Sequence, residues 1–79
     1  MSSYDHYSKA RELAKLLARD GVAALSEEVL DVMVIGSTGT EIFILLRVAV
    51  KKSLAQPNLS SDAIQLAKIL LTHLEKALQ

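Results

Sequence analysis

The chain has 79 residues, which is the size of one domain rather than two. Nine Lys and Arg residues balance nine Asp and Glu residues, so the basic excess typical of nucleic-acid-binding proteins is missing. There is no cysteine, which excludes disulfides and thiolate metal sites.

Apolar residues make up 51% of this short chain. A domain of this size buries only about 60% of the surface that its unfolded chain exposes, so we expect apolar surface outside the core, which an oligomer or a bound partner would cover. The first residues lack the features of a signal peptide, and the apolar run 42–50 is too short to span a bilayer. These features predict a single cytoplasmic domain over residues 1–79 with no membrane segment.

The first predicted helix covers residues 4–19. Apolar residues recur there at spacings of three and four, which is the period of one helix face. These residues are Ala10, Leu13, Ala14, Leu17 and Ala18. Ser2 or Ser3 is the expected N-cap, and Gly21 favours the left-handed conformation that ends many helices.

The second predicted helix covers residues 22–35 and ends at Gly36. Its apolar stripe contains Val22, Leu25, Val29, Val32 and Met33. Leu30 and Val34 lie off this stripe and widen the apolar surface of the helix. A later start is the alternative, with Ser26 as the N-cap of a first turn that favours the acidic residues following it.

The third predicted helix covers residues 39–55, and its start has the clearest signal in the chain. Thr38 and Glu41 form a Thr-x-x-Glu capping box. The helix is then apolar from 42 to 50 except at Arg47. Because a helix that is apolar around most of its circumference needs cover on nearly every side, we expect it at the centre of the fold or of an assembly.

The fourth predicted helix covers residues 61–78. Its candidate N-caps are Ser60, Ser61 and Asp62. Its broad apolar stripe contains Ile64, Ala67, Leu70, Leu71, Leu74 and Leu78. Short connections between amphipathic helices favour antiparallel neighbours. The sequence therefore predicts an all-α fold, a small four-helix antiparallel bundle with helix 39–55 central.

A central helix 39–55 has a measurable consequence. Replacing Leu45 or Leu46 with alanine then truncates a buried side chain, and we expect a loss of about 2–5 kcal/mol of stability. Wild-type stability after either change would contradict the predicted architecture.

The loop before the third helix is the best candidate for ligand chemistry. Ser37, Thr38, Gly39 and Thr40 lead into a helix N-terminus, whose free amides and positive dipole suit an anion. The spacing is not that of a P-loop, and Glu41 places a negative charge where the anion would bind. The alternative is that the glycines allow a tight turn and the hydroxyls cap the helix.

Neither catalysis nor a metal site is predicted. His6 and His73 have no second ligand-type residue at a metal-binding helical spacing, so we expect both to be exposed. Glu27 and Asp31 share a helix face, but no nucleophile or base accompanies them. We therefore expect no catalytic residue, no metal and no cofactor, and the protein is predicted not to be an enzyme.

One face of helix 39–55 is the candidate interface. It contains Thr40, Ile44, Arg47 and Lys51. If this face contacts solvent, Ile44 is an isolated exposed residue; if it contacts a partner, Ile44 is the anchor and Arg47 its polar neighbour. Tyr4 and Tyr7 are further interface candidates, with packing over the end of the bundle as the alternative.

Charged residues form two patches of opposite sign. The basic row on helix 4–19 consists of Arg11, Lys15 and Arg19. The acidic patch on helix 22–35 consists of Glu27, Glu28 and Asp31. We expect the two patches to face each other within one subunit or to meet across a symmetric dimer.

These features predict a non-catalytic helical protein–protein interaction module that forms a homodimer or binds another protein. The alternative is a helix-turn-helix transcriptional regulator, because a short glycine-containing turn joins the second and third helices. However, its recognition helix would begin with Glu41 and three apolar residues, whereas base-reading helices present Arg, Asn, Gln or Ser there. Nucleic acid is therefore not favoured as a partner. A bundle that binds a small anion at the Gly36–Thr40 loop is the third hypothesis.

Overall fold

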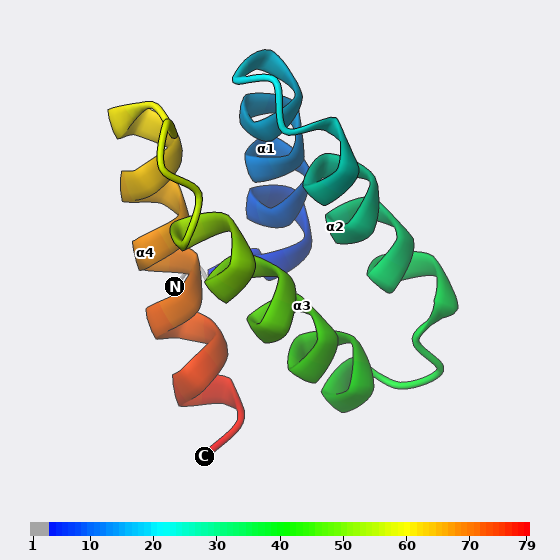
Figure 1. Cartoon of the computed structure of the whole chain (residues 1–79). Helices are drawn as coiled ribbons and strands as arrows, with labels where there is room; N and C mark the ends of the chain where they lie inside the picture. Colours follow the sequence, from blue (N-terminus) through cyan, green and yellow to red (C-terminus); the bar gives the residue numbers. More distant parts are fainter. Residues whose placement is uncertain (1–3) are drawn as a thin grey trace.

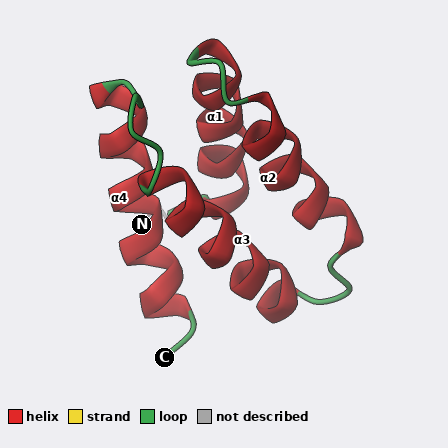
Figure 2. Cartoon of the chain, in the orientation of Figure 1, coloured by secondary structure: helices red, strands yellow, loops and turns green. Residues whose placement is uncertain are grey.

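The computed structural model describes residues 4–79 and contains four α-helices (Figure 1). The helices are α1 His6–Arg19, α2 Ala23–Ile35, α3 Gly39–Leu54 and α4 Ser61–Ala77. Loops connect them, and no strand occurs within the described residues (Figure 2). All four predicted helices are present, and the largest difference in their bounds is at α1, which begins at His6 rather than at residue 4.

The helices form a bundle in which successive helices run in opposite directions (Figure 1). Each helix packs against its neighbours in sequence, and α1 also packs against α4, so the four helices enclose one core. The predicted all-α four-helix bundle is therefore confirmed. Within residues 4–79, no helix has both the length and the apolar character that crossing a bilayer requires.

The first helix starts at a cap that the sequence patterns did not single out. The carboxylate of Asp5 accepts a hydrogen bond from the backbone amide of Ser8 at 3.0 Å, which is how an N-cap satisfies a free amide of the first turn. The predicted caps Ser2 and Ser3 lie outside the described residues. At the other end, Gly21 has a φ of +84°, as predicted for the residue that closes this helix.

The turn between α2 and α3 needs a glycine at one position and a hydroxyl at another. A Cβ atom at Gly36 would collide with the side chain of Ile42, so the two helices approach too closely for any larger residue. Thr38 caps α3 by accepting a hydrogen bond from the Glu41 amide at 3.1 Å. Only this half of the predicted capping box forms, because the Glu41 carboxylate accepts instead from the Ser37 hydroxyl at 3.1 Å.

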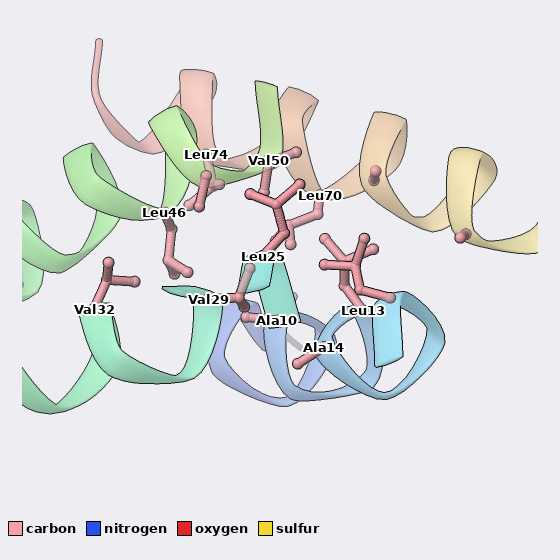
Figure 3. Close-up of a cluster of buried hydrophobic side chains, with 14 of the residues drawn as sticks. Ala10, Leu13, Ala14, Leu25, Val29, Val32, Leu46, Val50, Leu70 and Leu74 are labelled. Carbon is pink, nitrogen blue, oxygen red and sulfur yellow. The ribbon is translucent and has the colours of Figure 1, made fainter. Parts of the chain in front are cut away.

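The core is built from one face of each helix and consists mainly of leucine, valine and alanine (Figure 3). Leu46, Ala49 and Val50 of α3 are fully buried, so the inner face of α3 contributes to the core in the same way as one face of each other helix. The outer face of α3 is not covered within one chain, because Ile44 and Val48 are 42% and 46% exposed.

Candidate interaction surfaces

The outer face of α3 presents two apolar side chains side by side. Ile44 and Val48 are one helical turn apart and both exposed. Arg47 between them is half-buried, Lys51 is exposed, and neither forms an ion pair or hydrogen bond within residues 4–79. We call these four residues the α3 ridge. It contains three residues of the predicted interface and adds Val48, which was not among the residues predicted for that face of the helix.

Exposed apolar side chains also occur on α2. Leu30, Val34 and Ile35 are 41%, 82% and 69% exposed. The sequence pattern placed Leu30 and Val34 off the buried stripe, which is where the structure shows them, but it did not identify them as surface residues. Their positions outside the main stripe were the signal that could have done so.

A groove of about 250 Å³ runs between α1 and α2, and Leu30 lines it. Its lining residues are Arg11, Ala14, Lys15, Ala18, Ser26 and Leu30. The Ser26 hydroxyl donates a hydrogen bond to the carbonyl oxygen of Ala14 at 2.7 Å, which joins the two helices there. Ser26 is therefore not the N-cap of a later helix start; it lies inside α2 and is buried against α1.

Arg11 and Lys15 line this groove from α1, where Glu12 lies beside them, and the acids Glu27 and Asp31 lie on α2. Arg11, Lys15, Glu27 and Asp31 are all exposed. None of these four side chains forms an ion pair with another residue in 4–79. The two predicted patches therefore do not neutralise each other within one chain, and their charges stay available to a partner.

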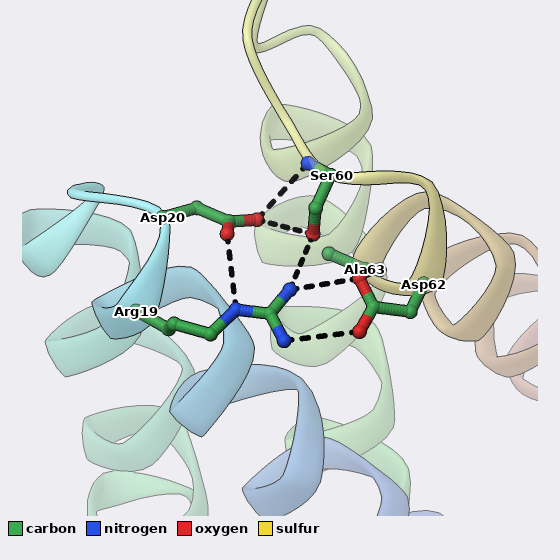
Figure 4. Close-up of polar contacts among 5 residues, drawn as sticks. All are labelled: Arg19, Asp20, Ser60, Asp62 and Ala63. Atoms are coloured by element: carbon green, nitrogen blue, oxygen red, sulfur yellow. Dashed lines mark hydrogen bonds and ion pairs between the residues drawn. The ribbon is translucent and has the colours of Figure 1, made fainter.

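The remaining members of the two patches are paired elsewhere. Glu28 of α2 forms an ion pair with Lys52 of α3 at 3.1 Å. Arg19 turns away from Arg11 and Lys15 and binds Asp62 at the start of α4 through two hydrogen bonds of 2.7 and 3.0 Å (Figure 4). The predicted row of three bases is thus reduced to two on the surface of α1.

Arg19 belongs to a network that joins the end of α1 to the start of α4 (Figure 4). Ser60 donates from its hydroxyl and from its backbone amide to Asp20, at 2.6 and 3.0 Å. Hydrogen bonds from Arg19 hold the pKa of Asp62 well below its usual range, and those from Ser60 lower the pKa of Asp20. Ser60 is the N-cap residue of α4 by position, but its hydroxyl serves this network instead of capping the helix.

Aromatic side chains cluster where α1, α3 and α4 meet. The rings of Tyr4 and His73 stack with centroids 3.7 Å apart, and His6 packs against Phe43 at 4.4 Å. The Nε2 atom of His6 lies 3.4 Å from the carbonyl oxygen of His73. The expectation that both histidines are exposed is wrong, because residues 67 positions apart come together at this end of the bundle and both rings are half-buried.

Both tyrosines proposed as interface residues contact this cluster. Tyr7 packs against Phe43 with centroids 5.7 Å apart. The buried hydroxyl of Tyr4 has no hydrogen-bond partner within residues 4–79, and burial raises its pKa. Packing over the end of the bundle, which was the alternative for these residues, accounts for the contacts that they make in the chain.

The candidate anion loop is occupied by its own hydrogen bonds. The hydroxyls of Ser37 and Thr38 bond to Glu41, while Gly39 and Thr40 are exposed at the start of α3. These bonds match the turn-and-cap interpretation of the loop. Within residues 4–79 there is also no cluster of three or more His, Asp or Glu side chains that fits a metal ion.

Comparison of the chain with protein-family models, with curated proteins and with solved structures gives no match. Function is therefore inferred from the surfaces described above. Both the α3 ridge and the groove between α1 and α2 place exposed apolar side chains beside charges that have no ion-pair partner within residues 4–79.

Proposed function

We propose that the protein is a non-catalytic helical protein–protein interaction module that associates with itself. The observation that carries this proposal is the set of large apolar side chains left exposed on three of the four helices. They are Leu30, Val34, Ile35, Ile44, Val48 and Ile69. Two pairs of them lie one helical turn apart, Leu30 with Val34 and Ile44 with Val48, and neighbouring exposed apolar side chains are typical of interaction sites. A net charge of zero provides no repulsion between copies.

Two clusters of polar residues support a structural rather than a chemical role. Arg19, Asp20 and Asp62 join two helix ends, and the histidine rings pack in an aromatic cluster. Neither group lines the groove between α1 and α2. A catalytic site needs reactive groups that converge on a space for the substrate, and these residues do not supply one.

The two alternative functions receive less support. A helix-turn-helix regulator would present the first two turns of α3 to DNA, but the exposed residues there are Gly39, Thr40, Glu41 and Ile44. The carboxylate of Glu41 repels phosphate. The same carboxylate lies at the Ser37–Thr40 loop and accepts the hydroxyl of Ser37, so it opposes anion binding as well.

The concentration dependence of thermal unfolding tests the proposal. If folded copies associate and unfolded chains do not, association stabilises the folded state by mass action. We expect the unfolding midpoint, followed by circular dichroism, to rise as the protein concentration increases a hundredfold. A midpoint that stays constant over this range would contradict self-association.

A further inference from the structure

The outer surface of α1 and α2 carries a charge pattern that is complementary to itself. Arg11 and Lys15 lie on the α1 side of the groove, and Glu27 and Asp31 are exposed on α2. Because none of the four has an ion-pair partner within residues 4–79, a surface with the opposite arrangement would satisfy all of them. A second copy of this chain presents that arrangement when it is turned over.

Building on the proposed self-association, we infer that two copies dimerise through this surface, with α1 of each copy lying over α2 of the other. We call the surface the α1–α2 face. Its exposed apolar residues are Ala18, Leu30 and Val34, with buried Ala14 at the floor of the groove, and its charged residues are Arg11, Lys15, Glu27 and Asp31. Each copy therefore covers the groove of the other with its own α1–α2 face, as in any isologous interface.

The heights of the charges along the helices fit this arrangement. The hydrogen bond between Ser26 and Ala14 sets these residues level on two antiparallel helices. Counting from that bond at 1.5 Å per residue, Lys15 and Glu27 differ in height by about 3 Å, and so do Arg11 and Asp31. A two-fold axis parallel to the helices keeps these heights, so it brings Lys15 over Glu27 of the second copy and Arg11 over Asp31.

The charges also exclude the other simple two-fold arrangement. An axis perpendicular to the helices would lay α1 on α1 and α2 on α2. Bases would then face bases and acids would face acids, and such contacts are strongly unfavourable. The signs of the exposed side chains therefore select one of the two ways in which this face can meet itself.

The apolar centre of the face suits close packing. Leu30 lines the groove, and Val34, one turn further along α2, is 82% exposed. Ala14 and Ala18 on α1 are small, so a helix of the second copy can approach closely. Apolar groups at the centre and charges at the rim are the usual arrangement in a specific interface.

The α3 ridge is less suited to dimerisation. It offers two apolar side chains on a single helix, Ile44 and Val48. A stable interface buries about 800 Å² on each partner, which a face of two helices supplies more readily than one ridge. The ridge therefore provides the control position for the experiment.

Charge reversal in separate chains tests the α1–α2 face. Lys15→Glu and Glu27→Lys each create like-charged contacts in their own homodimer, and we expect each to weaken dimerisation at least about tenfold, measured by sedimentation equilibrium. In a 1:1 mixture the heterodimer has opposite charges at both contacts, so dimers should reappear. Within each chain residues 15 and 27 keep like charges, so only pairing between chains explains this recovery.

Three further variants keep the result interpretable. Ile44→Glu on the α3 ridge is the matched control and should dimerise like the wild type. Arg11→Glu and Asp31→Arg repeat the design at the second contact, and they replace the first pair if circular dichroism shows that either of those variants has lost helix. Mixing should again restore the dimer.

The outcomes separate this inference from the proposed function. If the wild type dimerises, but charge-reversed chains keep its affinity or fail to recover on mixing, the α1–α2 face is overturned and self-association stands. Loss of the dimer in Ile44→Glu alone would move the interface to the α3 ridge. A wild-type chain that stays monomeric would overturn both.

Discussion

Gly36 occupies a position where any larger residue meets the neighbouring helix. A Cβ atom there would collide with the side chain of Ile42. We expect Gly36→Ala to cost about 1–3 kcal/mol, the range for overpacking that forces backbone or side chains to shift. Urea unfolding followed by circular dichroism measures the loss.

Gly39 provides the matched control for this prediction. A Cβ atom at Gly39 would lie 3.8 Å from the hydroxyl oxygen of Tyr7, an ordinary contact. Because alanine favours helix more than glycine does, Gly39→Ala should leave stability unchanged or slightly raised. Equal losses at both positions would mean that the close approach of Gly36 and Ile42 is not the cause.

The roles of single residues could be predicted from the sequence where they act on their own helix end. They could not be predicted where the residue contacts a partner far away in the sequence. Gly21 and Thr38 act on their own helix ends, so their roles follow from spacing along the chain. Ser26 bonds to a carbonyl on another helix, and His6 meets a residue near the other end of the chain. No pattern within a single helix carries information about such partners.

Within α3, two adjacent leucines differ in burial. Leu46 is fully buried, whereas Leu45 is only half-buried. We expect Leu46→Ala to cost about 2–5 kcal/mol and Leu45→Ala clearly less, because truncation costs most where the cavity is fully enclosed. The sequence pattern treated the two as equivalent, since both belong to one apolar run. Urea unfolding of both variants checks the order, and equal losses would contradict the orientation of α3.

The network at the start of α4 makes the stability of the fold depend on pH in the acidic range. The pKa values of Asp62 and Asp20 are lowered in the folded state, so the unfolded chain binds more protons at low pH. Their stabilisation is complete above the ordinary aspartate pKa of about 3.9 and is lost as the pH falls through the lower folded-state values. We expect Asp62→Asn to reduce the slope of unfolding free energy against pH below about pH 4.

The acid titration needs a variant that removes one carboxylate without touching the network. Glu75 is exposed on α4, so Glu75→Gln serves this purpose. Its unfolding free energy should keep the wild-type dependence on pH. If Asp62→Asn also keeps that dependence, the contacts between Arg19 and Asp62 do not stabilise the fold.

The sequence predicted where the helices begin and end more accurately than it predicted which neighbouring helix each side chain faces. Glycines and caps mark the ends of α1 and α3 in the chain itself. By contrast, four-residue spacing placed Arg19 in one row with Arg11 and Lys15, although the structure directs it to Asp62 of α4. Which neighbour a charged side chain reaches depends on how the helices pack, and spacing within one helix does not report that.

For the whole molecule, the apolar surplus is the property that connects sequence to function. Composition predicted that a chain of this size exposes apolar surface, and the structure shows it on α2, α3 and α4. The charge patches on helices 4–19 and 22–35 were predicted from spacing along the chain, with contact across a symmetric dimer as one of two expectations. The groove between the two helices was not predicted, because it forms only where α1 and α2 pack together.

The mass of the protein in solution tests the central claim most directly. Light scattering on a sizing column, repeated across a concentration series, measures this mass without any variant. We predict that it rises with concentration towards a dimer, about twice the 8.6 kDa of the chain. A mass that stays at that of one chain at every concentration would contradict self-association.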